Sequence, residues 1–442
     1  MTARGIILAG TGTGAGKTMV TAAILRAFVR GGRTVAAFKV GPDYLDPAHL
    51  ARAARRPAIN LDSWAMDGAT MHALLGSLAR DADLIVGEGV MGLFDGARGK
   101  PRDGFAPGST AELAHALGLP VVLVTDAHGM GQSIAAVVRG FATHDSRAPL
   151  AGIILNRVAS EVHGRLLVDA IGEALPDVPV LGLVPRIAAM AIPSRHLGLV
   201  QAAEIGDLDR RLDLAAEAIT PSLLDRLKTL AQPVVKTKNS PSRLPPPLGQ
   251  RIAIARDDAF AFAYPALLDA WRAAGTEIVP FSPLADDAPD ATADAIYLPG
   301  GYPELHAARL AAAERFRAGL VAAAERDACI FGECGGYMTL GRTLRDAEGC
   351  VHRMVGLLPL SSDFAQRKLH LGYRNARTLV TSPLGADGTV FAGHEFHYAR
   401  IDDEGAGAPL FDLSDAAGHN LGTGGRAIGR VMGSFVHLIA QR

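Results

Sequence analysis

The sequence predicts an α/β protein with two doubly wound domains, each with a mostly parallel sheet and helices on both faces. In both halves of the chain, short β-branched runs alternate with longer amphipathic stretches. A polar, proline-rich stretch separates the halves, and each half carries a motif of strand, glycine loop and helix. The chain has 442 residues, more than the roughly 250–300 at which one core stops growing. We therefore expect domains over residues 1–230 and 251–442, with a linker over 231–250.

Composition excludes several classes of protein. Hydrophobic residues make up 49% of the chain, charged residues 20%, and the formal net charge is −1, so we expect no nucleic-acid partner, which usually requires a basic stripe. No apolar run approaches the roughly 18 residues that span a bilayer, and the short run at 6–9 is expected to be a strand and not a signal peptide. Three cysteines are too few for a disulfide framework and favour a reducing compartment. We expect a cytoplasmic protein without a membrane partner.

The first half is expected to alternate strands and helices. A helix is expected over 18–30, where Gly31 and Gly32 end it. Ser109 and Glu112 have the spacing of a capping box that opens another helix. The expected strands cover residues 6–9, 35–40, 84–87, 121–125 and 153–155.

The second half repeats this alternation after the linker. Residues 236–247 are polar and end in three prolines, so they have little to bury and are expected to be semi-rigid. The order of the elements that follow predicts a second α/β domain. The expected strands cover residues 252–255, 278–281, 296–298 and 328–331, and the expected helices cover 261–274 and 305–325.

A phosphate-binding loop is predicted at residues 10–18 (GTGTGAGKT), between the first strand and the first helix. Its glycines let backbone N–H groups surround a phosphate, Lys17 reaches the β- and γ-phosphates, and Thr18 places its hydroxyl on Mg²⁺. The usual pattern has glycine at position 11, where this chain has Thr11 and carries its glycine at Gly10. A glycine-rich turn without a ligand is the alternative. The residues expected to bind ATP are Gly12, Thr13, Gly14, Ala15, Gly16, Lys17 and Thr18.

Two carboxylates follow predicted strands. Asp43 comes after the second expected strand, and Glu88 follows the third between two glycines. Ligands of open α/β sheets bind beyond the carboxyl ends of strands, and Mg²⁺ takes one or two carboxylates. We therefore expect Thr18, Asp43 and Glu88 to hold Mg²⁺. The alternative for Glu88 is a cap on a turn, and Asp95 is either a substrate contact or a turn residue.

The second domain carries a cysteine at a sharp turn. Residues 328–340 consist of an apolar strand, the turn GECGG and a helix, which is the arrangement of a nucleophile elbow with sulfur in place of oxygen. We expect the turn to lift the thiol of Cys334 clear of the sheet and to place it near a helix N-terminus, which favours the thiolate. Cys329 lies inside the strand and is expected to be a core residue, and Cys350 has no chemical context.

A cysteine nucleophile needs a base. His437 is the candidate, far downstream after a strand-like stretch, although its spacing fits a core histidine equally well. His394 and His397 compete with it, and we expect both to lie on one face of a strand.

A glycine pair is the candidate oxyanion hole. Gly300 and Gly301 follow another expected strand, in the sequence PGGYPE. Their backbone N–H groups, with the N–H of Gly335 after the nucleophile, would stabilise an oxyanion. The alternative is a glycine loop without a catalytic role.

These motifs resemble those of a known enzyme family. Residues 332–337 (GECGGY) and 299–304 (PGGYPE) are similar to class I glutamine amidotransferase domains, in the branch fused to amide synthases of the cobalamin pathway. The first half resembles dethiobiotin synthetase, which shares the offset glycine. Residues 39–47, 88–96 and 192–199 are similar to signatures of the cobyrinic acid and hydrogenobyrinic acid a,c-diamide synthase family. The resemblance covers nearly the whole chain in order.

The resemblance implies a P-loop NTPase-like domain of the dethiobiotin synthetase type, fused to a class I glutamine amidotransferase-like domain. The implied enzyme is a carbon–nitrogen ligase that amidates the a and c acetate carboxylates of hydrogenobyrinic acid, or of cobyrinic acid, in cobalamin biosynthesis. ATP would convert each carboxylate to an acyl phosphate, because a carboxylate does not react with ammonia at neutral pH. A Cys–His glutaminase would supply the ammonia.

The resemblance also implies roles for matched positions. Cys334 would attack the amide of glutamine, and His437 would raise its nucleophilicity. Many class I glutaminases have Glu two residues after this His, where this chain has Ile439, so the resemblance does not identify the group that orients His437. The implied glutamine-binding residues are Gly300, Gly301 and Gly335, the implied adenine contact is Asn156, and the residues implied to bind the corrinoid polycarboxylate are Tyr44, Leu45, Asp95, Arg195 and His196.

Alternatives stay open at this point. Cobyric acid synthase and nickel-sirohydrochlorin a,c-diamide synthase share the general motifs, although residues 42–44 and 91–95 favour diamide synthesis and the Ala- and Arg-rich composition favours the hydrogenobyrinic substrate. The non-enzymatic alternative is a P-loop switch with an inactive glutaminase-like module, which would not need an intact cysteine elbow. A homodimer is compatible with the sequence.

Overall fold

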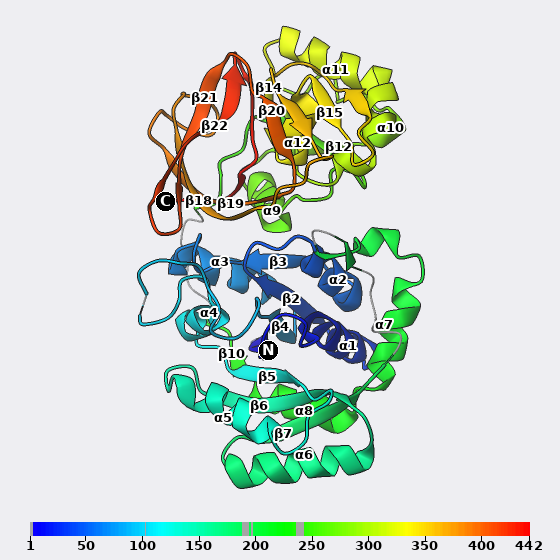
Figure 1. The fold of residues 1–442 in the computed structure, drawn as a ribbon, viewed down its shortest axis with the longest axis vertical. Helices are drawn as coiled ribbons and strands as arrows, with labels where there is room; N and C mark the ends of the chain where they lie inside the picture. Colours follow the sequence, from blue (N-terminus) through cyan, green and yellow to red (C-terminus); the bar gives the residue numbers. More distant parts are fainter. Residues whose placement is uncertain (1–2, 102, 188–193, 196–197, 236–242) are drawn as a thin grey trace. The chain divides into compact units, whose positions relative to one another are not determined.

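The computed structural model describes residues 3–101, 103–187, 194–195, 198–235 and 243–442. The chain forms two compact units, Met1–Ser242 and Arg243–Arg442 (Figure 1). Both units are α/β, as the sequence predicts. Among the described residues, no helix combines the length and the apolar character that crossing a membrane requires.

A parallel sheet forms the centre of the first unit. Its strands are β1 (Arg4–Gly10), β2 (Val35–Val40), β3 (Ala58–Leu61), β4 (Leu84–Glu88), β5 (Val121–Asp126), β6 (Leu150–Val158) and β7 (Val180–Pro185). They lie in the order β3-β2-β4-β1-β5-β6-β7, and neighbouring strands are parallel. The five expected strands are confirmed. Because β1 pairs with β4, with Leu8 opposite Glu88, the loop after β1 begins next to the end of β4.

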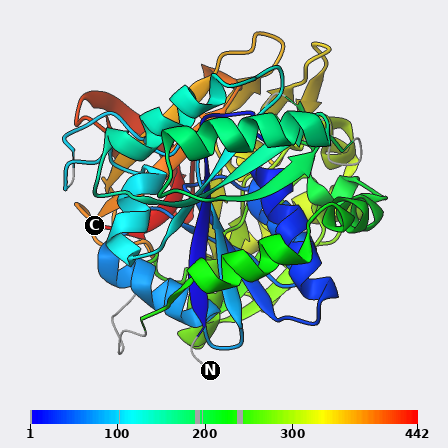
Figure 2. The same cartoon turned by 90° about the horizontal axis from the view of Figure 1, so that it is seen from below.

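Helices cover both faces of this sheet (Figure 2). Ser109 caps one of them, since its Oγ accepts the N–H of Glu112 at 3.1 Å. The Glu112 carboxylate accepts the N–H of Gly108, while the N–H of Ser109 donates to Ala106, so only half of the expected capping box forms. The helices are α1 (Lys17–Arg30), α2 (Leu45–Ala54), α3 (Gly68–Leu78), α4 (Thr110–Leu117), α5 (Ile134–His144), α6 (Glu161–Ala174), α7 (Leu208–Glu217) and α8 (Pro221–Leu230).

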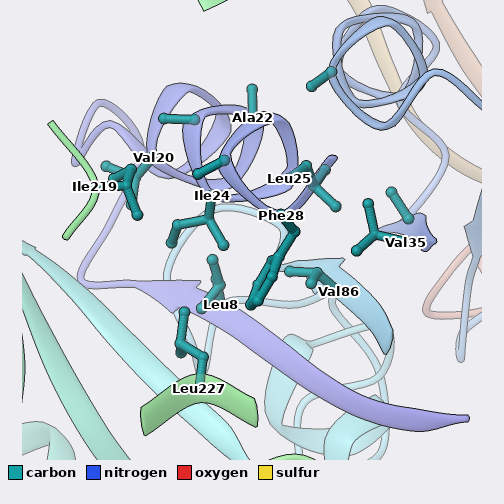
Figure 3. Packing of buried hydrophobic residues seen from close by; sticks show 14 of the residues in the cluster. Leu8, Val20, Ala22, Ile24, Leu25, Phe28, Val35, Val86, Ile219 and Leu227 are labelled. Atoms are coloured by element: carbon teal, nitrogen blue, oxygen red, sulfur yellow. The ribbon is translucent and has the colours of Figure 1, made fainter. Parts of the chain in front are cut away.

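One core of the first unit lies between the sheet and helices α1, α7 and α8. Figure 3 shows Leu8 and Val86 of the sheet facing Ile24 and Phe28 of α1, with Leu227 of α8 nearby. These side chains are at most 3% exposed. Burial of each contributes about 1.5–3 kcal/mol, so this apolar face fixes the position of the helix that follows the P-loop.

The ends of segment 231–250 belong to the two units. Gln232–Pro233 forms strand β10, which pairs antiparallel with β1. In the second unit, Trp271 Nε1 donates a 2.9 Å hydrogen bond to the carbonyl of Pro245. Residues 236–242 lie outside the described residues.

The second unit has a mixed sheet. Its strands are β11 (Arg251–Ala255), β12 (Glu277–Phe281), β13 (Ala295–Leu298), β14 (Cys329–Glu333), β18 (His370–Thr378), β19 (Val390–His397), β21 (Ala408–Asp415), β22 (Asn420–Ile428), β23 (Val431–Ser434) and β24 (His437–Gln441). The order β12-β11-β13-β14-β23 is parallel, and β22-β21-β18-β19-β24 continues it with antiparallel pairs. The four expected strands are confirmed, whereas the antiparallel half was not predicted.

Two expected helices of the second unit differ from prediction. The helix expected over 261–274 is α9 (Pro265–Ala273), which begins later because a residue before proline is disfavoured in a helix. The single helix expected over 305–325 is two, α10 (Ala307–Ala312) and α11 (Glu314–Glu325), because Ala313 has φ −76° and ψ 83° and interrupts the helical backbone. Helix α12 (Gly335–Leu340) follows the cysteine.

Candidate functional site

The P-loop joins the end of β1 to α1. Gly14 and Gly16 have φ values of 85° and 86°, in the left-handed region that glycine adopts at no steric cost. A side chain at Gly16 would also clash with the amide of Asn156. Backbone N–H groups and the N-terminus of α1 can therefore surround a phosphate here.

Lys17 is folded back over this loop. Its Nζ donates a 2.9 Å hydrogen bond to the carbonyl of Gly12, and a Cβ at Gly10 would lie 2.7 Å from Lys17 Cδ. The offset glycine therefore makes room for the lysine side chain. Burial and the charge of Lys39 lower the pKa of Lys17 to about 8, and a bound anion would raise it again.

A buried charge cluster lies beside the P-loop. Thr18 Oγ1 donates a 2.6 Å hydrogen bond to Glu88 Oε1. Lys39 Nζ contacts the same oxygen at 2.8 Å and Asp46 Oδ2 at 2.6 Å. Burial raises the pKa of Glu88 to about 7, against the effect of Lys39. Burial by itself would lower the pKa of Lys39, but the two carboxylates raise it above its usual value, so the lysine stays a cation between them.

Asp43 lies just before α2. Its Oδ1 accepts the N–H groups of Leu45 and Asp46 at 2.7 and 2.9 Å, so it caps the first turn of the helix. Burial and the charge of Asp46 raise the pKa of Asp43 to about 6. Asn60 Nδ2 donates to the Asp43 carbonyl at 2.7 Å and fixes the backbone. One carboxylate oxygen of Asp43 is thus used in capping, and the other would be its metal ligand.

The cluster fits a magnesium ion. Glu88 Oε2 is buried and has no hydrogen-bond partner among the described residues. Such an oxygen is costly to leave unpaired, and hydroxyl and carboxylate oxygens are ligands that Mg²⁺ takes. Thr18 and Glu88 bring both kinds of oxygen together beside the phosphate loop.

The loop after β4 touches the P-loop. Leu93 donates its N–H to the carbonyl of Gly10 at 2.9 Å. Asp95 is exposed, and its Oδ2 accepts the N–H of Gly92 at 2.7 Å. This hydrogen bond makes Asp95 a turn residue. Because its side chain is exposed beside the P-loop, it is also accessible to a substrate.

The other residues expected in the first unit have different settings. Tyr44 is half-buried at the start of α2, whereas Leu45 is only 6% exposed. Asn156 Nδ2 donates a 3.0 Å hydrogen bond to the carbonyl of Ala15, so its amide supports the P-loop. The backbone of Arg195 lies in strand β8 (Ser194–Arg195), and His196 lies outside the described residues.

The cysteine elbow is present in the second unit. Cys334 has φ 47° and ψ −102°, a sparsely populated backbone conformation of the kind found at functional sites. Its N–H donates to the carbonyl of Ser434 at 2.8 Å. A Cβ at Gly336 would clash with the carbonyl of Leu298, so the turn needs glycine there.

Gly300, Gly301 and His437 converge on the elbow. A Cβ at Gly300 would clash with the His437 ring and lie 3.4 Å from the Cβ of Cys334. A Cβ at Gly335 would lie 3.0 Å from the backbone nitrogen of Gly301. The glycine loop, the histidine and the nucleophile, all expected from separate parts of the sequence, therefore lie together.

The thiol is not activated by its position alone. Burial and the nearby Glu304 raise the pKa of Cys334, against a hydrogen bond from the backbone of Gly335. The expectation that the helix N-terminus favours the thiolate is therefore wrong for the free protein, since burial outweighs the six-residue α12. Burial also lowers the pKa of His437 to about 3, so both groups are neutral until a substrate changes their surroundings.

The two competing histidines do not share a face, contrary to expectation. His397 Nε2 lies 2.9 Å from Glu395 Oε1, whereas the His394 ring packs against Phe396. Residues two apart on a strand point the same way and residues three apart point to opposite faces. Both ring nitrogens of His397 face oxygens, of Glu395 and Ala399, so its ring already has two partners. His437 is the histidine that lies next to Gly300, beside the elbow.

Three residues of these sites were not predicted. In the first unit Lys39 pairs with both Glu88 and Asp46. In the second unit Glu333 lies 3.9 Å from His437. Lys39 could have been noticed as the one charged residue of a buried strand, VAAFKV. Glu333 could have been noticed as a charge at the buried end of β14, directly before the nucleophile.

Two family models match the chain. The CobQ/CobB/MinD/ParA nucleotide binding domain matches residues 6–200, and the CobB/CobQ-like glutamine amidotransferase domain matches residues 251–442. Curated relatives named hydrogenobyrinate a,c-diamide synthase are similar over nearly their full length. The one from Mesorhizobium japonicum is 49% identical and the alignment covers 100% of this chain and 99% of the relative. The relative from Agrobacterium fabrum is 48% identical, and the alignment covers 100% of both chains. The relative from Rhodobacter capsulatus is also 48% identical, and the alignment covers 99% of both chains.

Proposed function

Because the chain belongs to the hydrogenobyrinate a,c-diamide synthase family, we propose that it is a ligase of cobalamin biosynthesis. It uses ATP and glutamine to convert the a and c acetate carboxylates of hydrogenobyrinic acid to amides. The observation that supports this proposal is that one chain contains a phosphate loop beside a charge cluster and a cysteine elbow beside a histidine. Each half-reaction has its own site.

The first unit would activate the carboxylate. Lys17 and the backbone from Gly12 to Gly16 would hold the phosphates of ATP, and Asn156 would place the adenine through its amide. Thr18, Asp43 and Glu88 would hold Mg²⁺, which neutralises phosphate charge when bound. Lys39 keeps Glu88 in place.

The chemistry of the first unit follows from this arrangement. A carboxylate oxygen of the ring attacks the γ-phosphorus, and ADP leaves. Ammonia then attacks the carbonyl carbon of the acyl phosphate, and inorganic phosphate leaves with the bonding electrons. Tyr44, Leu45 and Asp95 would lie near the carboxylate being amidated. Arg195 and His196 would pair with other carboxylates of the ring, for which Arg is well suited.

The second unit would release ammonia from glutamine. Cys334 would attack the side-chain amide, and His437 would accept the thiol proton and deliver it to the leaving ammonia. The N–H groups of Gly300, Gly301 and Gly335 would stabilise the oxyanion. Water then hydrolyses the thioester to glutamate.

The proposed partners are small molecules, with no role for nucleic acid or membrane. We propose that the protein acts in the cytoplasm, where ATP and glutamine are available, and that it forms a homodimer. Light scattering of the purified protein measures its mass in solution, and a monomer would contradict the last point.

The test of this function compares two rings. Purified protein is incubated with ATP, Mg²⁺, glutamine and either hydrogenobyrinic acid or cobalt-loaded cobyrinic acid, and the products are weighed by mass spectrometry. The proposal predicts two amides per metal-free ring and one ADP per amide. ADP release without amide on either ring would reject it and favour another synthase or a nucleotide switch.

A further inference from the structure

A buried carboxylate lies directly behind the glutaminase histidine. Glu333 is the last residue of β14 and precedes Cys334. Its Oε1 accepts the N–H of Leu438 at 3.0 Å, and its Oε2 accepts the hydroxyl of Tyr297 at 2.6 Å. Two hydrogen bonds therefore fix the plane of this carboxylate.

The oxygen that accepts the Tyr297 hydroxyl is also the one nearest His437. Glu333 Oε2 lies 3.9 Å from His437 Nδ1, and both side chains are at most 3% exposed. No other basic group lies within 4.0 Å of Glu333 in the described ranges. Burying a carboxylate costs free energy even when it is hydrogen-bonded, and His437 is the one basic side chain that this carboxylate meets in the described ranges.

The other edge of the ring faces the nucleophile. A Cβ placed on Gly300 would approach both Cε1 and Nε2 of His437, and it would lie 3.4 Å from the Cβ of Cys334. The imidazole therefore has Nδ1 near Glu333, and its Cε1–Nε2 edge lies beside Gly300, next to the elbow. This is the order of carboxylate, imidazole and nucleophile that orients a catalytic base in hydrolases.

We infer that Glu333 is the positioning residue of the glutaminase, accepting the Nδ1–H of His437 so that Nε2 is the atom that takes the proton of Cys334. The inference rests on the proposed glutaminase function of the second unit. The distance of 3.9 Å is longer than a hydrogen bond, and such bonds are often long before substrate binds.

Glu333 would replace the Glu that many related glutaminases have two residues after the catalytic histidine. Two residues after His437, the chain has Ile439, which is 4% exposed and lies in β24. An apolar side chain there cannot accept a proton. The carboxylate comes instead from β14, from the residue next to the nucleophile.

The carboxylate also explains how a buried base can work. Burial raises the pKa of Glu333 to about 7 and lowers the pKa of His437 to about 3. Burial therefore favours the neutral form of both groups before substrate binds. During attack, the thiol proton moves to Nε2, the sulfur forms a bond to the amide carbon, and the carbonyl electrons move to oxygen. In this proposal Glu333 stabilises the imidazolium that results, alongside Glu395, whose charge raises the pKa of His437. The imidazolium then gives its proton to the departing ammonia.

The test uses Glu333→Gln with Tyr297→Phe as its matched control. The Gln side chain keeps the shape and an acceptor for Leu438, but its amide faces Nδ1 with a donor and favours the wrong tautomer. The Phe variant removes the hydroxyl that donates to Glu333 Oε2 and leaves the carboxyl group itself in place. Glutamate release, ammonium-supported amidation and the pH dependence of Cys334 alkylation by iodoacetamide are measured for each variant.

We expect Glu333→Gln to lower glutamate release roughly a hundredfold, less than the ~10⁴-fold loss in a serine triad, because a thiol needs less help from its base. Its alkylation profile moves to higher pH, since a less stable imidazolium leaves the thiol protonated. Ammonium-supported amidation stays unchanged, and Tyr297→Phe releases glutamate within about threefold of the parent protein. Glutamate release at the parent rate, or an equal loss in both variants without a pH shift, would overturn the inference.

A second measurement needs no variant. In parent protein with ¹⁵N-labelled histidine, the inference predicts that His437 carries its proton on Nδ1, with assignment by comparison with His437→Ala. A proton on Nε2 would overturn it even if Glu333→Gln does not fold. If the proposed glutaminase function itself were wrong, the parent protein would release no glutamate, and this result distinguishes that failure from a failure of the inference about Glu333.

Discussion

Thr18 Oγ1 donates a 2.6 Å hydrogen bond to Glu88 Oε1, joining the first turn of α1 to the end of β4. The bond couples the loop that would hold phosphate to the carboxylate that would hold Mg²⁺. Lys39 contacts the same oxygen from β2. Two strands of the parallel sheet and helix α1 therefore meet at one carboxylate, at the carboxyl edge where ligands of such sheets bind.

The substitution Glu88→Gln tests the proposed role of this carboxylate as a Mg²⁺ ligand. We expect amidation to fall at least roughly a hundredfold with either glutamine or ammonium as nitrogen source, because the substitution removes a charge that would hold Mg²⁺ next to phosphate. Glutamate release should stay within about threefold of the parent rate, since Cys334 is in the other unit. Glu173→Gln, an exposed position on α6, is the control. Parent-like ADP release by Glu88→Gln would contradict the assignment.

Gly16→Ala tests the P-loop. The new methyl group would meet the Asn156 amide at a backbone φ of 86°, so it is opposed both sterically and conformationally. We expect ATP to bind at least about tenfold more weakly, measured by calorimetry. Gly76→Ala on α3 has open space around its Cβ and should bind ATP like the parent. Equal affinity of both variants would show that the loop tolerates the change.

The two acidic residues at the start of α7 should differ in their effect on stability. Asp209 pairs with Arg26 and Arg52 at 2.5 Å each, and the Arg26 side chain is fully buried. Asp209→Asn leaves that guanidinium with Asp213, at 3.7 Å, as its remaining carboxylate. We therefore expect a loss of roughly 1–2 kcal/mol, limited by the exposure of Asp209 itself. Asp207→Asn, which affects only an exposed pair with Arg211, should cause no measurable change. Urea unfolding distinguishes the two, and equal midpoints would contradict the prediction.

Acid sensitivity should arise partly from Glu395. Burial would raise its pKa, but the hydrogen bond from His397 and the charges of His397 and Arg374 lower it to about 2, from an ordinary value of 4.5. A carboxylate with a depressed pKa in the folded state adds stability above its unfolded pKa and loses it as the pH falls. Glu395→Gln should therefore be less stable than the parent at pH 7, by at most roughly 3 kcal/mol.

The pH dependence of that difference is the test. We expect the difference between Glu395→Gln and the parent to shrink as the pH falls from 4.5 to about 2, measured by urea unfolding at each pH. Glu325→Gln, an exposed position at the end of α11, should give a difference near zero throughout. A difference that stays constant with pH would show that Glu395 acts through packing and not through its charge.

Elements with strong local patterns were predicted from the sequence. The buried strands β1, β2, β4 and β5 are mostly apolar, and the P-loop and the elbow combine glycines with a lysine or a cysteine in fixed order. The antiparallel half of the second sheet was missed because strands such as β22, NLGTGGRAI, are rich in glycine and polar residues. Their pairing depends on long-range contacts that short windows do not contain.

The candidate sites were predicted only in part. Residues in motifs were found, but Lys39, Asp46 and Glu333 act through partners distant in the sequence or through burial, which spacing does not reveal. Asp43 was expected as a metal ligand, and its role in capping α2 became apparent only from the backbone geometry. The break at Ala313 also has no signal, since alanine is a strong helix former.

The central claim is that one chain makes ammonia at Cys334 and uses it for amidation in the other unit. The most direct measurement is the mass of the hydrogenobyrinic acid product formed by Cys334→Ala with ATP and Mg²⁺, with glutamine in one reaction and ammonium salt in another. Cys350→Ser, at an exposed cysteine, is the control and should behave like the parent. We predict no amide with glutamine and two amides with ammonium for Cys334→Ala. Two amides with glutamine, or none with ammonium from a folded variant, would contradict the claim.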